Sequence, residues 1–202
     1  MVRIQLVEDD PDFVYLLESM IGRERDMEIV SCGHDRKSCV ADAQEQSPDV
    51  VLLDLILSSG EDRTMEGIEI AREIRLKTRA KILILTSLEK PGIVLKASTR
   101  AFASGYLFKS SYGQIPEMIR NVSKGNGAEE IMICAAVIHQ LTPSEYYVLL
   151  HYLGYQVELH SSPKTIANQL SSIVKKLGLR KPDDLTAIFS NYPNLQEITN
   201  FA

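Results

Sequence analysis

The sequence predicts an α/β fold followed by a smaller all-helical region, and two patterns in its 202 residues predict it. In residues 1–125, short apolar runs alternate with amphipathic segments, as expected when parallel strands are buried on both faces and joined by helices. From Leu141 onward, only helical patterns remain. The alternation in the first part implies a doubly wound sheet with right-handed crossovers, whose ligand crevice lies at the carboxyl ends of the strands.

The elements of the first part follow one another in a regular order. The predicted strands are short and apolar: Val2–Val7, Glu28–Ser31, Val50–Leu55, Lys81–Thr86 and Gly105–Phe108. The predicted helices are amphipathic: Pro11–Ile21, Arg36–Gln46, Glu66–Lys77, Gly92–Ala103 and Gln114–Lys124. Pro11 follows Asp10 at the position where proline suits the first helical turn, and Ser47-Pro48 ends the second helix.

The second part begins where Gly125-Asn126-Gly127 breaks the last of these helices. We expect residues 126–140 to form a linker whose apolar run Ile131–Ile138 is a short helix packed between two domains, residues 1–125 and 141–202. The helices predicted in the second domain are Pro143–Leu153, Pro163–Leu177 and Pro182–Ser190. Thr142 and Ser162 each precede a proline, which is the N-cap and N1 pattern of a helix start.

Composition excludes several classes of protein. Apolar content of 45% with a mean hydropathy of −0.06 is typical of a soluble globular chain, and no apolar run approaches the ~20 residues that span a bilayer. Without a signal-peptide pattern, we expect a cytoplasmic protein without a membrane partner. Three cysteines without paired spacing argue against a disulfide framework. Cys32, His34 and Cys39 lack the second pair of ligands that a zinc site needs, so small buried thiols are the favoured interpretation.

The net charge of −5 is unevenly distributed. Residues 1–140 hold 22 acidic and 17 basic residues, whereas residues 141–202 hold five of each. All five of those bases fall within Ser161–Lys181, a stretch without an acid. This separation fits an acidic signalling domain joined to a part that contacts a polyanion, although a solvated helix face fits the charge alone equally well.

Polar residues stand where the predicted strands end: Glu8, Asp9, Asp54, Thr86 and Lys109. Carboxylates that converge in one crevice repel one another unless a cation joins them, and their hard oxygens suit Mg²⁺. A lysine and a hydroxyl beside them suit phosphate oxygens. The set therefore predicts phosphoryl transfer to an aspartate, although Asp54 alone also fits a helix cap and Lys109 alone a surface charge.

Four segments, "LVEDDPDF", "DVVLLDL", "ILILTS" and "GYLFKSS", resemble the receiver domains of two-component response regulators over residues 1–125. The resemblance implies a flavodoxin-like (βα)5 fold with Asp54 as phosphoacceptor and Lys109 as the phosphate-pairing lysine. It also implies that Thr86 and Tyr106 switch together, and that Mg²⁺ is bound by Glu8, Asp9, Asp54 and the Ile56 carbonyl. Its partner would be a sensor histidine kinase. Such a protein is a phosphoacceptor rather than an enzyme, with at most slow self-catalysed phosphoryl transfer and hydrolysis.

The sequence departs from the receiver pattern beside the acceptor. The family places a glycine about eight residues after the acceptor, whereas Gly67 follows Asp54 by thirteen. The segment Ser58–Thr64 thus looks like an insertion. Ser58 and Ser110 stand where the family often has prolines. We expect phosphorylation because the chemical set is intact, while the pocket geometry and the lifetime of the phosphoryl group stay open.

The segments "LTPSEYYVLL" and "SSPKTIANQLSSIVKKLGLR" are similar to the NarL/LuxR-type helix-turn-helix domain over residues 141–190. The resemblance makes the second segment a recognition helix for DNA. Its apolar positions are Ile166, Leu170, Ile173, Val174 and Leu177. Its expected DNA-binding positions are Lys164, Thr165, Asn168, Gln169, Lys175 and Lys176. Only Tyr155–Ser161 separate Gly154 from Ser162, so the usual supporting helix is missing or cut to one turn.

The sequence is compatible with three functions. The leading one is a phosphorylation-controlled transcription regulator that binds promoter DNA, as a homodimer when phosphorylated. The alternative is a receiver with a degenerate output domain that acts by protein–protein interaction without DNA. A phosphatase with an aspartate nucleophile is disfavoured because Ile56 replaces the second aspartate of such enzymes.

Overall fold

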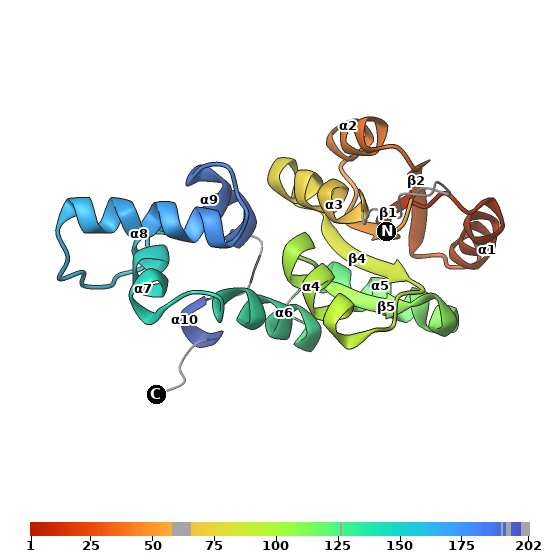
Figure 1. The fold of residues 1–202 in the computed structure, drawn as a ribbon. Helices are drawn as coiled ribbons and strands as arrows, with labels where there is room; N and C mark the ends of the chain where they lie inside the picture. Colours follow the sequence, from red (N-terminus) through yellow and green to blue (C-terminus); the bar gives the residue numbers. More distant parts are fainter. Residues whose placement is uncertain (58–65, 126, 191, 193–194, 199–202) are drawn as a thin grey trace.

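A five-stranded parallel sheet forms the centre of the N-terminal part of the chain, in the order β2-β1-β3-β4-β5 (Figure 1). The computed structural model describes residues 1–57, 66–125, 127–190, 192 and 195–198. The strands are β1 Val2–Val7, β2 Met27–Gly33, β3 Val50–Leu53, β4 Lys81–Thr86 and β5 Gly105–Phe108. The helices joining them are α1 Pro11–Ile21, α2 Arg36–Gln46, α3 Glu66–Lys77, α4 Pro91–Ala101 and α5 Ile115–Lys124. The predicted fold class is confirmed.

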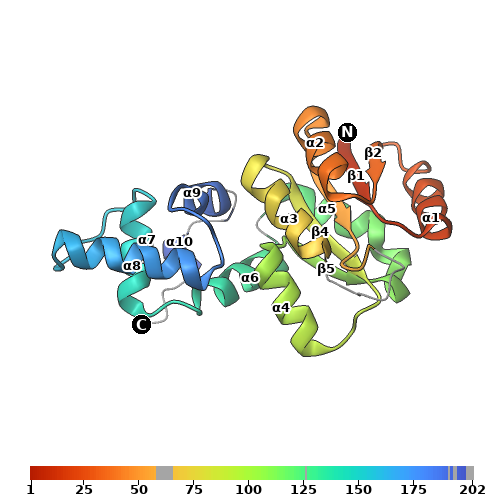
Figure 2. The same ribbon diagram turned by 45° about the horizontal axis from the view of Figure 1, so that its top comes forward.

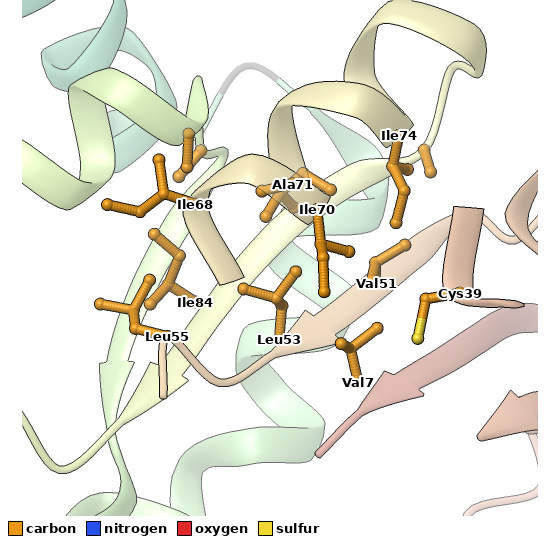
Figure 3. Packing of buried hydrophobic residues seen from close by; sticks show 14 of the residues in the cluster. Val7, Cys39, Val51, Leu53, Leu55, Ile68, Ile70, Ala71, Ile74 and Ile84 are labelled. Atoms are coloured by element: carbon orange, nitrogen blue, oxygen red, sulfur yellow. The ribbon is translucent and has the colours of Figure 1, made fainter. Parts of the chain in front are cut away.

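Both faces of the sheet are covered by helices, which explains why the central strands β3 and β4 are almost entirely apolar. On one face, Val51 and Leu53 of β3 pack under α2, α3 and α4, with Ile70 and Ile74 of α3 at the centre (Figure 3). On the other face, the alternate strand residues pack with apolar residues of α1 and α5. Successive side chains of each strand point to opposite faces of the sheet, so alternate residues pack into two separate cores.

Several element boundaries differ from the predicted ones for local reasons. Strand β3 ends at Leu53, two residues early, since Asp54 leaves the ladder to enter the crevice. Helix α4 ends at Ala101 because Phe102 adopts the left-handed conformation, with φ 51° and ψ 47°. A 3₁₀ helix, Lys109–Gln114, precedes α5.

The C-terminal part is helical, and its core also takes in Phe102 at the end of α4 and Leu76 of α3. Its helices are α6 Ala128–Ile138, α7 Pro143–Tyr152, α8 Pro163–Lys176, α9 Asp183–Phe189 and α10 Leu195–Ile198. Thr142 caps α7 in a capping box with Glu145, and Ser162 caps α8, as the proline pairs predicted. Residues 155–160 have no regular secondary structure, so no helix lies between α7 and α8 in this described stretch. The predicted loss of the supporting helix is confirmed.

The expected short helix at residues 131–138 is α6, and it packs between the two parts (Figures 1 and 2). Cys134 and Val137 are buried in the helical core, while Ile133 packs against the core of the sheet. The Lys81 ammonium is 2.7 Å from a carboxylate oxygen of Glu130 across this contact. Helix α6 is therefore part of both units.

A fully buried arginine of α3 also meets the helical part. The Arg75 guanidinium carbon is 5.1 Å from the ring centroid of Tyr192, and the neighbouring Arg72 donates to the Gly178 carbonyl. The part that contains the sheet and the helical part thus meet through α3 as well as through α6.

All three cysteines are free thiols. Cys39 and Cys134 are buried, but Cys32 is exposed. The expectation of a buried thiol is therefore wrong for Cys32, because it lies on β2 at the edge of the sheet. No helix among the described residues is long and apolar enough to cross a membrane.

Candidate functional site

Three of the polar residues at the strand ends meet in one ion cluster. Glu8 follows β1, Asp54 follows β3 and Lys109 follows β5. The Lys109 ammonium is 2.7 Å from a Glu8 carboxylate oxygen and 2.8 Å from an Asp54 carboxylate oxygen. Glu8 is 5% and Asp54 7% exposed, so the ammonium neutralises charge that water hardly reaches.

Burial and charge act against each other in this cluster. Burial raises the pKa of Glu8, and the Lys109 ammonium only partly opposes that rise. Burial alone would lower the pKa of Lys109, but its hydrogen bonds to Asp54 and Glu8 outweigh burial and raise the pKa. The Phe13 ring, its centroid 4.5 Å from the ammonium, covers Lys109 from the α1 side. Lys109 is thus held charged between two carboxylates and an aromatic face.

The backbone around Asp54 is fixed by its neighbours. The Asp54 amide donates to the Val7 carbonyl at 2.9 Å, and the Ile56 amide donates to an Asp54 carboxylate oxygen at 3.3 Å. Gly67, at the start of α3, lies so close that a Cβ there would overlap the Asp54 carbonyl oxygen. Its amide donates to the Leu55 carbonyl at 3.2 Å. A glycine therefore packs against the Asp54 backbone despite the thirteen-residue spacing. The proposed insertion Ser58–Thr64 lies outside the described residues.

Thr86 and Tyr106 lie on adjacent strands beside the cluster. Thr86 is fully buried, and its hydroxyl has no hydrogen-bond partner among the described residues. The half-buried Tyr106 donates its hydroxyl to the Leu88 carbonyl at 2.8 Å, and burial raises its pKa to about 12. The Tyr106 amide, on the edge of the sheet, donates to a Glu129 carboxylate oxygen at 3.3 Å. Helix α6 is therefore hydrogen-bonded to the strand that carries Tyr106.

The predicted metal ligands are only partly brought together. Glu8 and Asp54 converge on Lys109, while Asp9 is half-buried and does not join them as a third carboxylate. Within the described ranges, no three His, Cys, Asp or Glu side chains gather closely enough to hold a metal ion by themselves. The donor set still fits a hard divalent cation, because its carboxylates outnumber the single lysine that contacts them.

The predicted DNA-binding residues lie on α8. Lys164, Thr165, Asn168 and Lys175 are exposed, and Gln169 is half-buried. The Lys176 ammonium, by contrast, is 2.6 Å from a carboxylate oxygen of Glu145 on α7. The predicted apolar positions Ile166, Leu170, Ile173, Val174 and Leu177 face the helical core. Helix α8 thus has one face packed on the core and one polar face exposed to solvent, and Lys176 forms an ion pair with α7.

Two residues at the site were not predicted from the sequence. Phe13 covers Lys109 from α1, and Glu129 binds the Tyr106 amide from α6. Neither belongs to a polar group at a strand end, which was the pattern used to find the others. An aromatic residue four positions after Asp9 is the only signal for Phe13.

The comparisons with known proteins identify the family. Residues 4–120 match the response regulator receiver domain, so the chain belongs to that family. It is a two-component response regulator of the NarL/LuxR family. The Bacillus subtilis transcriptional regulatory protein DesR is 30% identical over 190 residues, which are 89% of this chain and 92% of DesR. The Staphylococcus aureus response regulator protein VraR is 28% identical over 190 residues, 85% of this chain and 88% of VraR.

Solved structures agree with the fold. A LuxR-family two-component response regulator from Aurantimonas has a TM-score of 0.57 and 30% identity, covering 69% of this chain and 97% of that one. The Salmonella typhimurium RcsB response regulator covers 94% of this chain and all of its own, with a TM-score of 0.55 and 22% identity. The second similarity shows that both parts of the chain have a known overall fold.

Proposed function

We propose that Asp54 accepts a phosphoryl group from a sensor histidine kinase and that the phosphorylated chain regulates transcription by binding DNA. The observation that carries the proposal is the Lys109 ammonium, held within 2.8 Å of both Glu8 and Asp54 at the carboxyl end of the sheet. Residues 1–125 would be the receiver, 126–140 the linker and 141–202 the output domain.

The acceptor chemistry follows from the charges. A carboxylate oxygen of Asp54 attacks phosphorus, the bond from phosphorus to the donor imidazole breaks, and the imidazole keeps the electron pair and takes a proton from water. The product is an acyl phosphate on Asp54. Lys109 already neutralises part of the negative charge at this point, so the approach of an anionic phosphoryl group costs less. The chain thus serves as acceptor, with at most slow transfer and hydrolysis of its own.

Magnesium fits this donor set. Glu8, Asp9, Asp54 and the Ile56 carbonyl are the groups that would hold it, and the bound ion would neutralise charge on the phosphoryl oxygens. Glu8 is buried beside Lys109, so its carboxylate is fixed in place for that role. Ile56 donates its amide to Asp54, which fixes the backbone whose carbonyl would be the fourth ligand.

Thr86 and Tyr106 would be the side chains that change position when Asp54 is phosphorylated. The unpartnered Thr86 hydroxyl is a donor for a phosphoryl oxygen on Asp54, and Tyr106 would move inward with it. Shifting the equilibrium between the inactive and active conformations from 1:99 to 99:1 takes about 5.5 kcal/mol of differential binding. A few charge-assisted hydrogen bonds to the phosphoryl group would supply that energy. The Tyr106 ring lines the same hollow as Ile133 of α6, so that movement would change a surface shared with α6 and could reach the output domain.

DNA binding by α8 is supported by its open polar face and by similarity to DesR, a transcriptional regulatory protein. Lys164 and Lys175 would contact phosphates together with Thr165, and Asn168 and Gln169 would read base edges. Lys176 was expected to contact DNA too, but its ion pair with Glu145 gives it a role in holding α8. The alternative, an output domain that binds only protein, is favoured by the missing supporting helix.

Phosphorylation is tested by incubating the full chain with acetyl phosphate and magnesium and resolving the product on a phosphate-affinity gel. We expect the wild-type chain and Asp12→Asn, an exposed control on α1, to shift, and Asp54→Asn not to shift. A shift retained by Asp54→Asn would place the acceptor elsewhere.

DNA binding is tested by titrating the phosphorylated chain with random promoter DNA at low and high salt. The exposed Lys164 and Lys175 would displace counterions condensed on the DNA phosphates, so affinity should fall as the salt concentration rises. A chain without measurable affinity at low salt would favour the protein-binding alternative.

A further inference from the structure

Helices α2 and α3 lie next to each other on one face of the sheet, and two hollows open between them (Figures 1 and 2). The first hollow, of about 460 Å³, lies where Asp49 leads into β3 and Lys81 begins β4. The second, of about 370 Å³, continues toward Arg36 at the start of α2. Gln44 and Lys77 line both hollows, which therefore join into one groove that we call the α2–α3 groove.

The α2–α3 groove is separate from the phosphoacceptor cluster. Asp49 precedes β3 and Asp54 follows it, so the groove lies at the amino ends of the strands and the cluster at their carboxyl ends. None of the residues of the ion cluster, Glu8, Asp54 and Lys109, lines either hollow. A ligand in the groove would thus serve a purpose beyond the proposed phosphoryl transfer.

The charge of the groove is opposite to that of the whole chain. Five basic and two acidic side chains line it, although the net charge of the chain is −5. The basic ones are Arg36, Lys37, Lys77, Arg79 and Lys81, and the acidic ones are Asp49 and Glu73. A concave surface with an excess of positive charge raises the local concentration of anions. The groove therefore favours an anionic ligand.

Three of these bases alternate along the turn from α3 to β4. Lys77, Arg79 and Lys81 all line the first hollow, with Arg79 in the middle. Arg79 is exposed and forms no ion pair with a described residue. The Lys81 ammonium is only 17% exposed and is fixed 2.7 Å from a carboxylate oxygen of Glu130. A guanidinium between two ammonium groups suits phosphoryl oxygens, because its planar fork binds two of them at once.

The acidic side chains of the groove are already engaged. Asp49 accepts a hydrogen bond from the Arg3 amide at 2.8 Å, and Glu73 is 2.7 Å from the Lys77 ammonium and 2.9 Å from the Arg36 guanidinium. Arg79 has no such partner, so its charge is available to a ligand. The first hollow, with three bases and one acid, is balanced by a ligand with about two negative charges.

The wall formed by α2 is neutral over its middle turns. Val40, Ala41 and Gln44 line the second hollow there, opposite Lys77 of α3. A ligand with a charged end and an uncharged end would fit these two walls. The volumes of the hollows lie in the range that small-molecule sites occupy, roughly 300–1,000 Å³.

We propose that the α2–α3 groove binds a small molecule that carries a diphosphate group, held by Lys77, Arg79 and Lys81. The diphosphate lies in the first hollow, and the rest of the molecule lies along α2. Because Lys81 also pairs with Glu130 of α6, the diphosphate competes with Glu130 for this ammonium. Binding is thereby linked to the contact between the sheet and the helical part.

The test is isothermal titration calorimetry of the full chain with ADP and, separately, with inorganic pyrophosphate, in magnesium-free buffer at about 0.15 M salt, where distant surface charges are screened. We expect at least one of the two probes to bind. Arg79→Glu should raise its dissociation constant about tenfold or more, because a charge-assisted contact is replaced by repulsion. Arg25→Glu is the matched control, since Arg25 is exposed, makes the same change in net charge and lines neither hollow. Tighter binding of ADP than of pyrophosphate would indicate an organic ligand, and the reverse an inorganic one.

A second pair of variants tests the role of Lys81. Glu130→Gln should tighten binding several-fold, because Lys81 loses its competing carboxylate. Glu158→Gln makes the same change in net charge at a side chain that is 91% exposed, and it should leave the affinity unchanged. Circular dichroism of each variant checks that it is folded.

Three results would overturn the site: binding of neither probe, equal weakening by Arg79→Glu and Arg25→Glu, or equal affinities of Glu130→Gln and Glu158→Gln. Labelling of the same samples by acetyl phosphate is independent of these results, because Asp54 lies at the other end of β3. A labelled chain that fails to bind either probe would remove the ligand site and leave the phosphoacceptor intact.

Discussion

Glu145 fastens α8 to α7, and replacing it with glutamine should loosen the helical part of the chain. Its carboxylate accepts hydrogen bonds from the Thr142 amide at 2.8 Å, the Ser172 hydroxyl at 2.7 Å and the Lys176 ammonium at 2.6 Å. The side chain is 6% exposed. Two of these donors, Ser172 and Lys176, lie on α8, so the Glu145 carboxylate joins α7 to α8 where no supporting helix lies between them.

The magnitude follows from the three contacts. A hydrogen bond to a charged group contributes about 1.5–3 kcal/mol, and glutamine keeps an oxygen for one of the donors. Lys176 is 37% exposed, so solvent screening limits its ion pair to about 1 kcal/mol or less. Glu145→Gln should therefore lower the free energy of unfolding by about 2 kcal/mol at neutral pH.

The free energy of unfolding lost in Glu145→Gln should depend on pH. Burial would raise the pKa of Glu145, but the hydrogen bonds from Lys176, Thr142 and Ser172 outweigh it and hold the pKa at about 2. The pKa in the folded chain is thus below the ordinary value of about 4.3, so the stabilisation is complete above that value and is lost as the pH falls toward the folded-state pKa.

Urea unfolding followed by circular dichroism, at neutral pH and at several acidic values, measures both effects. Glu158→Gln is the control, because that side chain is 91% exposed and should change stability little. Equal stability of wild type and Glu145→Gln at neutral pH would refute the reasoning. So would a difference that stays constant as the pH falls.

Three further predictions concern the site and α8. Gly67→Ala should slow acetyl phosphate labelling and lower the melting temperature, because its Cβ would overlap the Asp54 carbonyl; unchanged values of both would contradict the close approach. Phe13→Leu should slow labelling several-fold by releasing Lys109 from its aromatic contact, with Phe13→Tyr restoring the rate; a rate insensitive to both would show that the ring does not position Lys109. Lys175→Glu should weaken DNA binding and reduce its salt dependence by about one released counterion or more, measured by fluorescence anisotropy; an unchanged slope would remove Lys175 from the interface.

The sheet and most of the site were predictable from sequence for one physical reason. Parallel strands end at the same edge, so polar residues that follow apolar runs must gather there, and Glu8, Asp54 and Lys109 do. The positions of the strands could be read from local sequence, since both faces of the sheet are buried and the strand segments are mainly apolar.

Features that depend on the direction of a distant side chain could not be predicted. Phe13 reaches Lys109 across about a hundred residues of sequence, and Glu129 reaches an edge amide from a helix expected only to pack between domains. The pairing of Lys176 with Glu145 likewise depends on how α8 sits on α7. The four-residue helix α10 is too short to leave a periodic pattern.

The measurement that tests the central claim most directly is chemical mapping of the acceptor. The full chain is incubated with acetyl phosphate and magnesium, reduced with borohydride to convert an acyl phosphate to homoserine, and digested for mass spectrometry. Our account predicts homoserine at position 54 and at no other aspartate. Homoserine at Asp9 or Asp10 instead, or none anywhere in a chain that binds magnesium, would contradict it.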